Sequence, residues 1–434
     1  SGSHTLAAVP EIMWNAILDL WPVVLSATTV ALSLVATVHI LLWKRDSRAA
    51  IGWTGLVWLA PLLGVLVYFC FGINRIQRRA ASLGVRESWQ PETEIPLTAE
   101  DVVHRDQLRR QHPDLVGLAS VGRCLTDRPL LPGNRVQPLV DGDQAYPEML
   151  AAIDAAQRSV CLLSYIFDCD RAGIRFHDAL VRARNRGVDV RVLIDDVGAR
   201  YSRPRMHHRL SASGVLATTF LPTRVPRLFK YANLRNHRKI LIVDGKTAFT
   251  GGTNIREGHW LAQNPKSPVQ CVHFRLDGPV VVQLQEVFSA DWAFATGESL
   301  EGERWFPDLE RAGPVFARGI AGGPDEDFER LTDVLLAALS AAREQVRIVT
   351  PYFLPEIQLI RALNVAAMRG VDVRVYLPAK NNIPLVQWAS TDLFWQLLEK
   401  GCRIFLTPPP FDHTKLFVID QVWALIGSTN WDPR

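Results

Sequence analysis

A histidine, a lysine, an aspartate and an asparagine occur twice in this chain with the same spacing. Both copies fit the pattern H-x-K-x4-D-x6-G-[GS]-x-N without a gap, the first from His237 to Asn254 and the second from His413 to Asn430. A single H-x-K-x4-D would be a weak signal, because a strand can carry His and Lys by chance. Two full copies make chance a poor explanation. The candidate catalytic residues are His237, Lys239, Asp244, His413, Lys415 and Asp420.

These residue types suit chemistry on a phosphodiester without a metal. Two lysines and two asparagines can surround a phosphate with positive charge and donors, which stabilises the charge that builds on its oxygens. One imidazole can attack phosphorus while the other protonates the departing alkoxide. The phosphate-binding candidates are Gly252, Asn254, Ser428 and Asn430, where the small residues allow close approach of the backbone. No cysteine or histidine has metal-ligand spacing, so neither a metal nor another cofactor is expected.

The local sequence predicts how these groups are presented. On an extended strand, His237 and Lys239 share one face with Leu241 and Val243, while Asp244 ends the strand on the other face. Asp-Gly at 244–245 is typical of a hairpin turn, which returns the chain towards the small residues and the asparagine. The second copy has the same parity.

The motifs belong to a longer internal repeat. The heptad Arg-Gly-Val-Asp-Val-Arg-Val occupies residues 186–192 and again residues 369–375. In each copy a helical pattern, an apolar strand and a second helical pattern lead to it. The ranges are 146–158, 160–167 and 174–186 in the first copy, and 328–344, 346–353 and 358–369 in the second. Alternating strands and helices predict two α/β halves with helix-covered parallel strands, whose equivalent strand ends meet at one cleft.

Two uncharged stretches precede the repeat. Residues 20–43 and 51–73 are each long enough to cross a hydrocarbon core about 30 Å thick. We therefore expect two N-terminal transmembrane helices that form a hairpin around the polar loop 44–48, in a multi-pass protein. The alternative is two core helices of a globular protein. Arginines after the second stretch outnumber the basic residues of the loop by one, which favours a cytoplasmic catalytic body.

Length and composition agree with several domains. A chain of 434 residues, 48% hydrophobic and 21% charged, is neither a lone small binding module nor a disordered chain. The expected divisions are 1–19, an N-terminal segment that starts with a tag remnant; 20–79, the transmembrane hairpin; 80–130, a linker; 131–310, the first half; and 311–434, the second half. The first half continues well past Asn254, whereas the second stops soon after Asn430, so we expect an incomplete C-terminal end.

These features resemble the phospholipase D superfamily and, within it, bacterial cardiolipin synthases. The superfamily resemblance rests on the paired motifs. The narrower resemblance rests on Pro61-Leu-Leu-Gly64, Tyr165-Ile-Phe-Asp168, Asn236-His-Arg-Lys239, Thr350-Pro-Tyr-Phe-Leu-Pro355 and Trp388-Ala-Ser390. The chain departs from the family at Val269–Val272, where a Trp-Arg-Asp-like stretch is usual, and at Asn382, where aspartate is common. The resemblance implies a duplicated phospholipase D-like α/β/α body, with two mixed sheets flanked by helices and one shared active site.

The resemblance also implies a function. A phosphatidyl group would pass from one phosphatidylglycerol to another through a phosphohistidine, giving cardiolipin and glycerol at the bacterial inner membrane. His237 would be the nucleophile and His413 the general acid and then base, with Tyr165 and Tyr352 at the substrate. The implied partners are anionic phospholipids and the bilayer rather than nucleic acid, and a homodimer is left open.

A basic stretch leads into the first motif. Between Asp196 and Asp244 the chain has ten basic residues and no acidic one. Arg224, Arg227 and Lys230 are our candidates for contact with anionic headgroups, and an ordinary solvated loop is the alternative. Two other functions compete with the transferase. A phospholipase D or another phosphodiester hydrolase would use the same residues with water as acceptor, whereas a non-enzymatic scaffold would have no use for both motifs.

Overall fold

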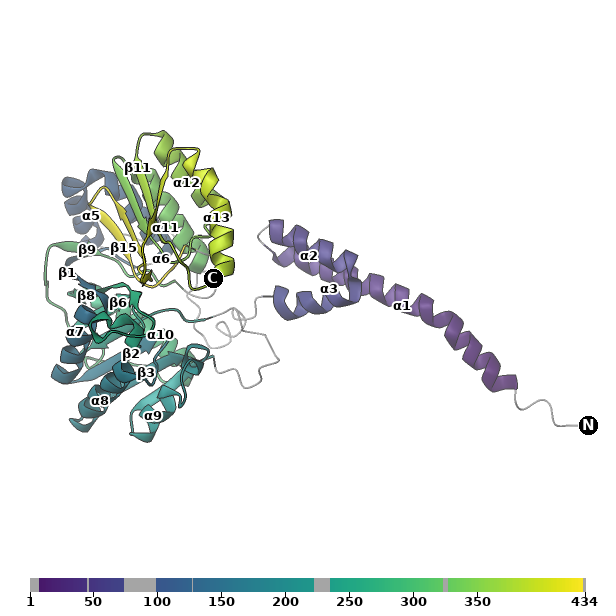
Figure 1. Ribbon diagram of the computed structural model, residues 1–434, viewed down its shortest axis with the longest axis horizontal. Coiled ribbons are helices and arrows are strands. Elements are labelled where there is room, and N and C mark those ends of the chain that lie inside the picture. Colours follow the sequence, from purple (N-terminus) through teal and green to yellow (C-terminus); the bar gives the residue numbers. More distant parts are fainter. Residues whose placement is uncertain are drawn as a thin grey trace, which may run out of the picture. The chain divides into compact units, whose positions relative to one another are not determined.

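The computed structural model describes residues 8–44, 47–73, 99–126, 128–221, 235–322 and 327–431 (Figure 1). These residues form two compact units, a helical one within Ser1–Arg79 and an α/β body that begins after it.

The helical unit begins with one long helix. Helix α1 runs from Ala8 to Trp43, and its part Leu20–Trp43 is the one described helix that is long and apolar enough to span a membrane. The side chains along this part are largely exposed, as expected of a surface that faces lipid rather than a protein core.

The prediction of a second transmembrane helix over residues 51–73 is wrong for the described chain. This stretch is divided into α2 (Ser47–Leu59), α3 (Pro61–Val67) and a π-helical turn (Tyr68–Gly72). The break falls at Ala60, whose φ of −136° and ψ of 69° leave the helical region. Proline has no N–H to donate and disfavours a helical conformation in the residue before it, so Pro61 accounts for the break.

Contacts within the helical unit explain its fold-back. A Cβ at Gly64 would lie 2.4 Å from the carbonyl oxygen of Leu56, so only glycine lets α3 approach α2 this closely. His39 Nδ1 lies 2.7 Å from the hydroxyl of Tyr68, and the Ser33 hydroxyl donates to the carbonyl of Val57. Residues of the two uncharged stretches therefore pack against each other through polar and aromatic side chains.

The body contains two mixed sheets built on the same plan. The first has the order β4-β3-β2-β5-β6-β8-β1-β9 and the second the order β12-β11-β10-β14-β15. In each sheet three parallel strands are followed by an antiparallel hairpin, so β2, β3 and β5 correspond to β10, β11 and β14. The first-sheet strands are β1 (Leu131–Val140), β2 (Ser159–Ser164), β3 (Asp189–Asp195), β4 (Leu216–Phe220), β5 (Ile240–Val243), β6 (Thr247–Gly251), β8 (Val272–Asp277) and β9 (Val315–Ala317). The second-sheet strands are β10 (Gln345–Val349), β11 (Asp372–Pro378), β12 (Arg403–Thr407), β14 (Leu416–Ile419) and β15 (Trp423–Ile426). The predicted duplication is present, and so is the predicted order of helices and strands along each copy.

Helices cover the sheets. On the first sheet, α7 and α8 pack on one face, whereas α10 packs on the other, where Gln285 contacts Cys161 of β2. On the second sheet, α12 contacts β11 and α13 contacts β12. The helices are α7 (Asp141–Ala155), α8 (Arg171–Asn185), α9 (Met206–Ala212), α10 (Val280–Thr296), α11 (Asp327–Ala341), α12 (Ile357–Met368) and α13 (Pro384–Leu398).

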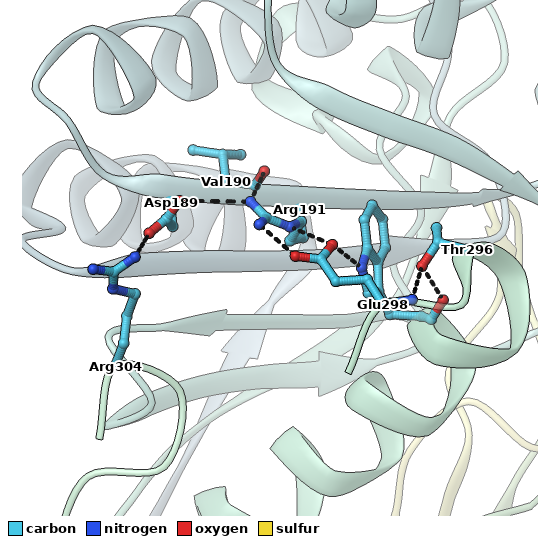
Figure 2. A network of polar contacts seen from close by, with 7 residues as sticks. Asp189, Val190, Arg191, Thr296, Glu298 and Arg304 are labelled. Atoms are coloured by element: carbon cyan, nitrogen blue, oxygen red, sulfur yellow. Dashed lines mark hydrogen bonds and ion pairs between the residues drawn. The ribbon is translucent and has the colours of Figure 1, made fainter. Parts of the chain in front are cut away.

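The repeated heptad forms β3 and β11. Val190 and Val192 of β3 point into the core, and period-2 alternation places Arg191 on the opposite face. Figure 2 shows Arg191 between Asp189 and Glu298. The heptad is therefore a structural repeat, in which valines build the core and the arginine pairs with a carboxylate.

Two segments depart from the expected boundaries. Within residues 80–130, α5 (Ala99–Gln111) and α6 (Val116–Thr126) are helical, and Leu115 and Leu118 belong to the core of the second half. Strand β9, from the range assigned to the second half, pairs with β1 of the first sheet. Apolar burial joins the first segment to the body, and backbone pairing with β1 joins the second; composition alone reveals neither.

Candidate active site

The two motifs meet where the two halves of the body contact each other. The strand pair β7 (Val269–Gln270) and β13 (Phe411–Asp412) joins the halves immediately before His413. From this connection the His413 ring reaches the first motif, where its Nδ1 lies 2.9 Å from the Gly252 carbonyl oxygen. Both imidazoles keep partial exposure, whereas Lys239 and Lys415 are buried, with 4% and 5% of their surfaces exposed. The site therefore combines two partly exposed histidines with two buried lysines.

The first histidine is stacked on a tyrosine. The rings of His237 and Tyr165 are 4.3 Å apart and 15° from parallel. Lys239 Nζ donates to the carbonyl of His237 at 2.6 Å and lies 5.3 Å from the Tyr165 ring centre. Tyr165 directly follows β2, so the sheet fixes the surface on which the imidazole rests.

The second histidine has an equivalent but looser neighbour. Tyr352 presents its edge to His413 with the ring centres 6.3 Å apart, and its hydroxyl donates to Asn382 Oδ1 at 2.9 Å. Lys415 Nζ donates to the carbonyl of His413 at 2.8 Å. The lysine-to-histidine contact is thus the same in both halves, whereas the tyrosine contact differs.

The first half fixes the orientation of His413. Its backbone N–H donates to the carbonyl of Gln270 at 2.8 Å, and its Nδ1 contacts the carbonyl of Gly252. A carbonyl oxygen can only accept, so Nδ1 carries the proton of the neutral ring and Nε2 keeps its lone pair. The nitrogen left for chemistry on His413 is therefore Nε2.

Burial sets the proton affinities of the site. Loss of solvation lowers the pKa of Lys239 to about 7. The pKa of His413 is lowered well below its usual value, first by loss of solvation and then by the charges of Lys415 and Lys239. At rest the site favours a neutral His413, and an anion bound between the lysines would raise the proton affinity of all three groups.

The two motif aspartates lie away from the imidazoles. Asp244 follows β5, at the end opposite His237, and accepts hydrogen bonds from the backbone N–H groups of Gln157, Arg158 and Ser159. Asp420 follows β14 and accepts equivalent bonds from residues 343–345. Asp244 also starts the predicted hairpin turn, with a φ of 54°. These carboxylates bind the turns that lead into β2 and β10.

The four residues predicted to bind phosphate have different surroundings in the structure. Asn254 Oδ1 accepts from the backbone N–H of Ile166 at 3.2 Å, which places this side chain under the Tyr165 loop. Asn430 Oδ1 is buried and has no hydrogen-bond partner among the described residues. Ser428, with Lys415, lines a cavity of about 610 Å³ that is mainly apolar. Gly252 contributes its carbonyl oxygen, which binds His413, to the site.

Several residues in the site were not predicted from the motifs. His259 is buried with its ring 6.2 Å from His413, and His273 is buried on β8 opposite Gly251. Loss of solvation lowers the pKa of each to about 3, so both are neutral. Asp195 and Asp291 contact the segment that contains His237. The Asp-Asp pair at 195–196, two residues beyond the repeated heptad, was a signal for Asp195, whereas Asp291 had none.

Part of the basic stretch is paired. Arg200 and Arg205 both contact Asp196, at 2.5 and 3.6 Å. The three candidate headgroup contacts, Arg224, Arg227 and Lys230, lie outside the described residues. Within the described part of the chain, no three His, Cys, Asp or Glu side chains are arranged to hold a metal ion.

Comparisons with known proteins show the family to which the chain belongs. The family described as "Cardiolipin synthase, PLD-like domain" matches residues 149–292 and 335–434, and the phospholipase D-nuclease N-terminal family matches residues 31–72. The cardiolipin synthase of Listeria monocytogenes serotype 4b is 29% identical over 409 residues, covering 92% of this chain and 84% of that protein. Cardiolipin synthase 1 of Bacillus anthracis is 30% identical over 422 residues, covering 94% and 81%.

A solved structure shows the same fold. Phosphatidylserine synthase from Haemophilus influenzae Rd KW20 is 13% identical and superposes with a TM-score of 0.51, over 70% of this chain and 80% of that chain. The paired motifs, the duplicated sheets and the family match define a phospholipase D-type enzyme. The chain belongs to the cardiolipin synthase family of this superfamily, whose members are phosphatidyltransferases.

Proposed function

We propose that this protein makes cardiolipin from two phosphatidylglycerol molecules and releases glycerol. The observation that carries the proposal is the pairing of two partly exposed imidazoles with two buried lysines in one site. A phosphodiester fits this site because the two lysines have lost solvation by burial. The negative charge of a bound phosphodiester would stabilise their positive charges.

In the first half-reaction the imidazole of His237 attacks phosphorus of the donor lipid. A nitrogen–phosphorus bond forms, and the bond between phosphorus and the glycerol headgroup oxygen breaks. His413, protonated at Nε2, gives its proton to the departing oxygen, so glycerol leaves neutral. Stacking on Tyr165 limits rotation of the His237 ring and presents it in a fixed plane, which favours attack.

In the second half-reaction a hydroxyl of another phosphatidylglycerol replaces glycerol. His413 Nε2, now neutral, takes the proton of that hydroxyl while its oxygen bonds to phosphorus. The nitrogen–phosphorus bond then breaks and His237 is restored. The Gly252 carbonyl supports both roles, because it keeps the Nδ1 proton in place while Nε2 loses and regains its own.

The substrate itself prepares His413 to act as an acid. Without an anion, Lys415 and Lys239 disfavour a charged His413. A bound phosphodiester offsets those charges and raises the histidine pKa, so the proton is taken up when the donor lipid is in place. This order keeps acid catalysis coupled to substrate binding.

We further propose that the body works on the cytoplasmic side of the bacterial inner membrane. The span Leu20–Trp43 keeps it at the bilayer, where lipid acceptors are concentrated relative to a soluble enzyme. Arg224, Arg227 and Lys230 would add attraction to anionic headgroups, and we expect no nucleic-acid partner. The reaction as written needs one copy of the chain, since both motifs are present in it.

The test is incubation of the purified full chain with phosphatidylglycerol vesicles, followed by product analysis by mass spectrometry. Cardiolipin and glycerol are the expected products, and added glycerol should slow net synthesis because the exchange is reversible. A matched control is His177→Asn, which removes a histidine of α8 that contacts Asp178 and Ser213 outside the site. Mainly phosphatidic acid, indifferent to glycerol, would establish the hydrolase instead.

The roles of the two histidines are tested by trapping. In the variant His413→Ala the adduct on His237 should form slowly, because glycerol leaves without a general acid, and should then persist, because no base activates the acceptor. Peptide mapping under alkaline conditions would locate it. An adduct found on His413 in the variant His237→Ala, with none in the first variant, would reverse the assignment.

A further inference from the structure

One carboxylate of α10 binds the residues on both sides of His237. Asp291 Oδ2 accepts a hydrogen bond from Asn236 Nδ2 at 2.8 Å. The guanidinium of Arg238 donates Nη1 to both oxygens of the same carboxylate, at 2.7 and 2.6 Å. The Arg238 and Asp291 side chains are 14% and 12% exposed, so water does not replace these contacts readily.

The same segment is also tied internally and through its backbone. The N–H of Arg238 donates to Asn236 Oδ1 at 3.1 Å, so the side chains that flank His237 are joined to each other. The N–H of Asn236 donates to Asp195 Oδ2 at 3.1 Å, at the end of β3. The residues before and after His237 are therefore bound to each other and to the same carboxylate, Asp291.

The second histidine is positioned by other means. His413 is fixed by the backbone of the first half, through the carbonyls of Gln270 and Gly252. Its following residue, Thr414, accepts from the N–H of Val272 at 3.1 Å. A substitution in the Asp291 contacts should therefore affect one histidine and leave the other in place.

We propose that Asp291 is a positioning residue for His237, acting through Asn236 and Arg238. The inference rests on the proposed function in assigning nucleophilic attack to His237. Asp291 binds the residues on both sides of His237 and so fixes the position of the segment that carries the imidazole. A shift of about 1 Å in a reacting group can lower a rate by about 100-fold.

The variant Asp291→Asn tests this most directly. The amide is nearly isosteric but uncharged, and it has one acceptor oxygen where two served Arg238 and Asn236. We expect kcat to fall about 10- to 100-fold with KM changed less than about threefold, because the phosphate-binding lysines are untouched. Asp291→Glu, which restores the charge, should recover part of the lost turnover.

The control breaks another ion pair between an arginine and a carboxylate in the same half, with a more exposed carboxylate. Glu298, just beyond the end of α10, pairs with Arg191 at 2.7 Å (Figure 2). It also accepts a hydrogen bond from the Trp292 indole. Glu298→Gln removes the charge there without touching the histidine segment. Thermal unfolding of both variants, in the same detergent, shows how much each loss destabilises the fold.

The decisive readout is the single-turnover rate of adduct formation on His237, measured in the His413→Ala background. Asp291→Asn should slow this step by the same factor as kcat, whereas Glu298→Gln should leave it within threefold. Equal effects of both variants, or an adduct rate unchanged by Asp291→Asn, would overturn the positioning role. Absence of any adduct on His237 with Asp291 intact would instead refute the nucleophile assignment, so the two failures are distinguishable.

Discussion

The substitution Asp244→Ala separates the structural and catalytic interpretations of the motif aspartate. In the structure this carboxylate accepts three backbone N–H groups at the turn before β2, and the chain passes through it with a φ of 54°. Nothing in this geometry brings it to the imidazoles. We therefore expect loss of stability and retention of the chemical step.

The magnitude follows from the contacts. The part-buried bond from the Ser159 N–H to a charged acceptor contributes about 2 kcal/mol. The two exposed bonds from Gln157 and Arg158 contribute about 0.5 kcal/mol each, because water can replace them. Alanine in the left-handed backbone conformation of residue 244 costs about 1 kcal/mol more than aspartate, which adopts that conformation more readily. The total is about 4 kcal/mol, which for a body of roughly 350 residues lowers the melting temperature by about 5 °C.

The assay pairs thermal unfolding with turnover measured well below the transition and normalised to folded protein. The control is Asp154→Ala, which removes an exposed ion pair with Arg182 and should shift the melting temperature by about 1 °C or less. Asp244→Ala should keep its turnover rate within about threefold of the unsubstituted protein's. If turnover instead drops by about 100-fold or more while the melting temperature is unchanged, this reasoning is refuted.

Other outcomes follow from the same site. Since the pKa of Lys239 is lowered to about 7, its charge is present below that pH and lost above it, so kcat/KM for the anionic lipid should fall as pH rises past 7; a flat profile from pH 6 to 9 would contradict this. Tyr165→Phe should retain most activity and Tyr165→Ala should lose about tenfold, because the ring rather than the hydroxyl supports His237; the turnover rates of the two variants decide. Excess chelator should leave activity intact, and restoration by added magnesium or zinc after a loss would show a metal requirement. Charge reversal at Arg224, Arg227 and Lys230 should weaken binding to anionic vesicles more than turnover of detergent-dispersed lipid, and equal losses in both assays would place these residues in the cleft.

The sequence alone determined the repeat and the local structure around the motifs. The heptad and its flanking patterns predicted corresponding strands, and β2 with β3 and β10 with β11 pair in parallel as expected. Asp-Gly after the first motif strand predicted the β5–β6 hairpin. These features were readable because strand alternation, helix periodicity and turn chemistry depend on residues within a few positions of one another.

Tertiary structure decided which of the recognised residues lie near the two imidazoles. Asp244 and Asp420 share the motif with the histidines, yet four-residue strands separate them, and the turns they bind come from 85 and 75 positions away. Gly252, a predicted phosphate-binding residue, has a contact with His413 that the sequence did not predict, between residues 161 positions apart. Asp291 comes from a helix without a recognisable motif. Such contacts form only when distant segments pack together, and no local pattern records them. The uncharged residues 51–73 predicted only that this stretch prefers apolar surroundings. Its division into separate helices depends on the break at Pro61 and on the close packing at Gly64.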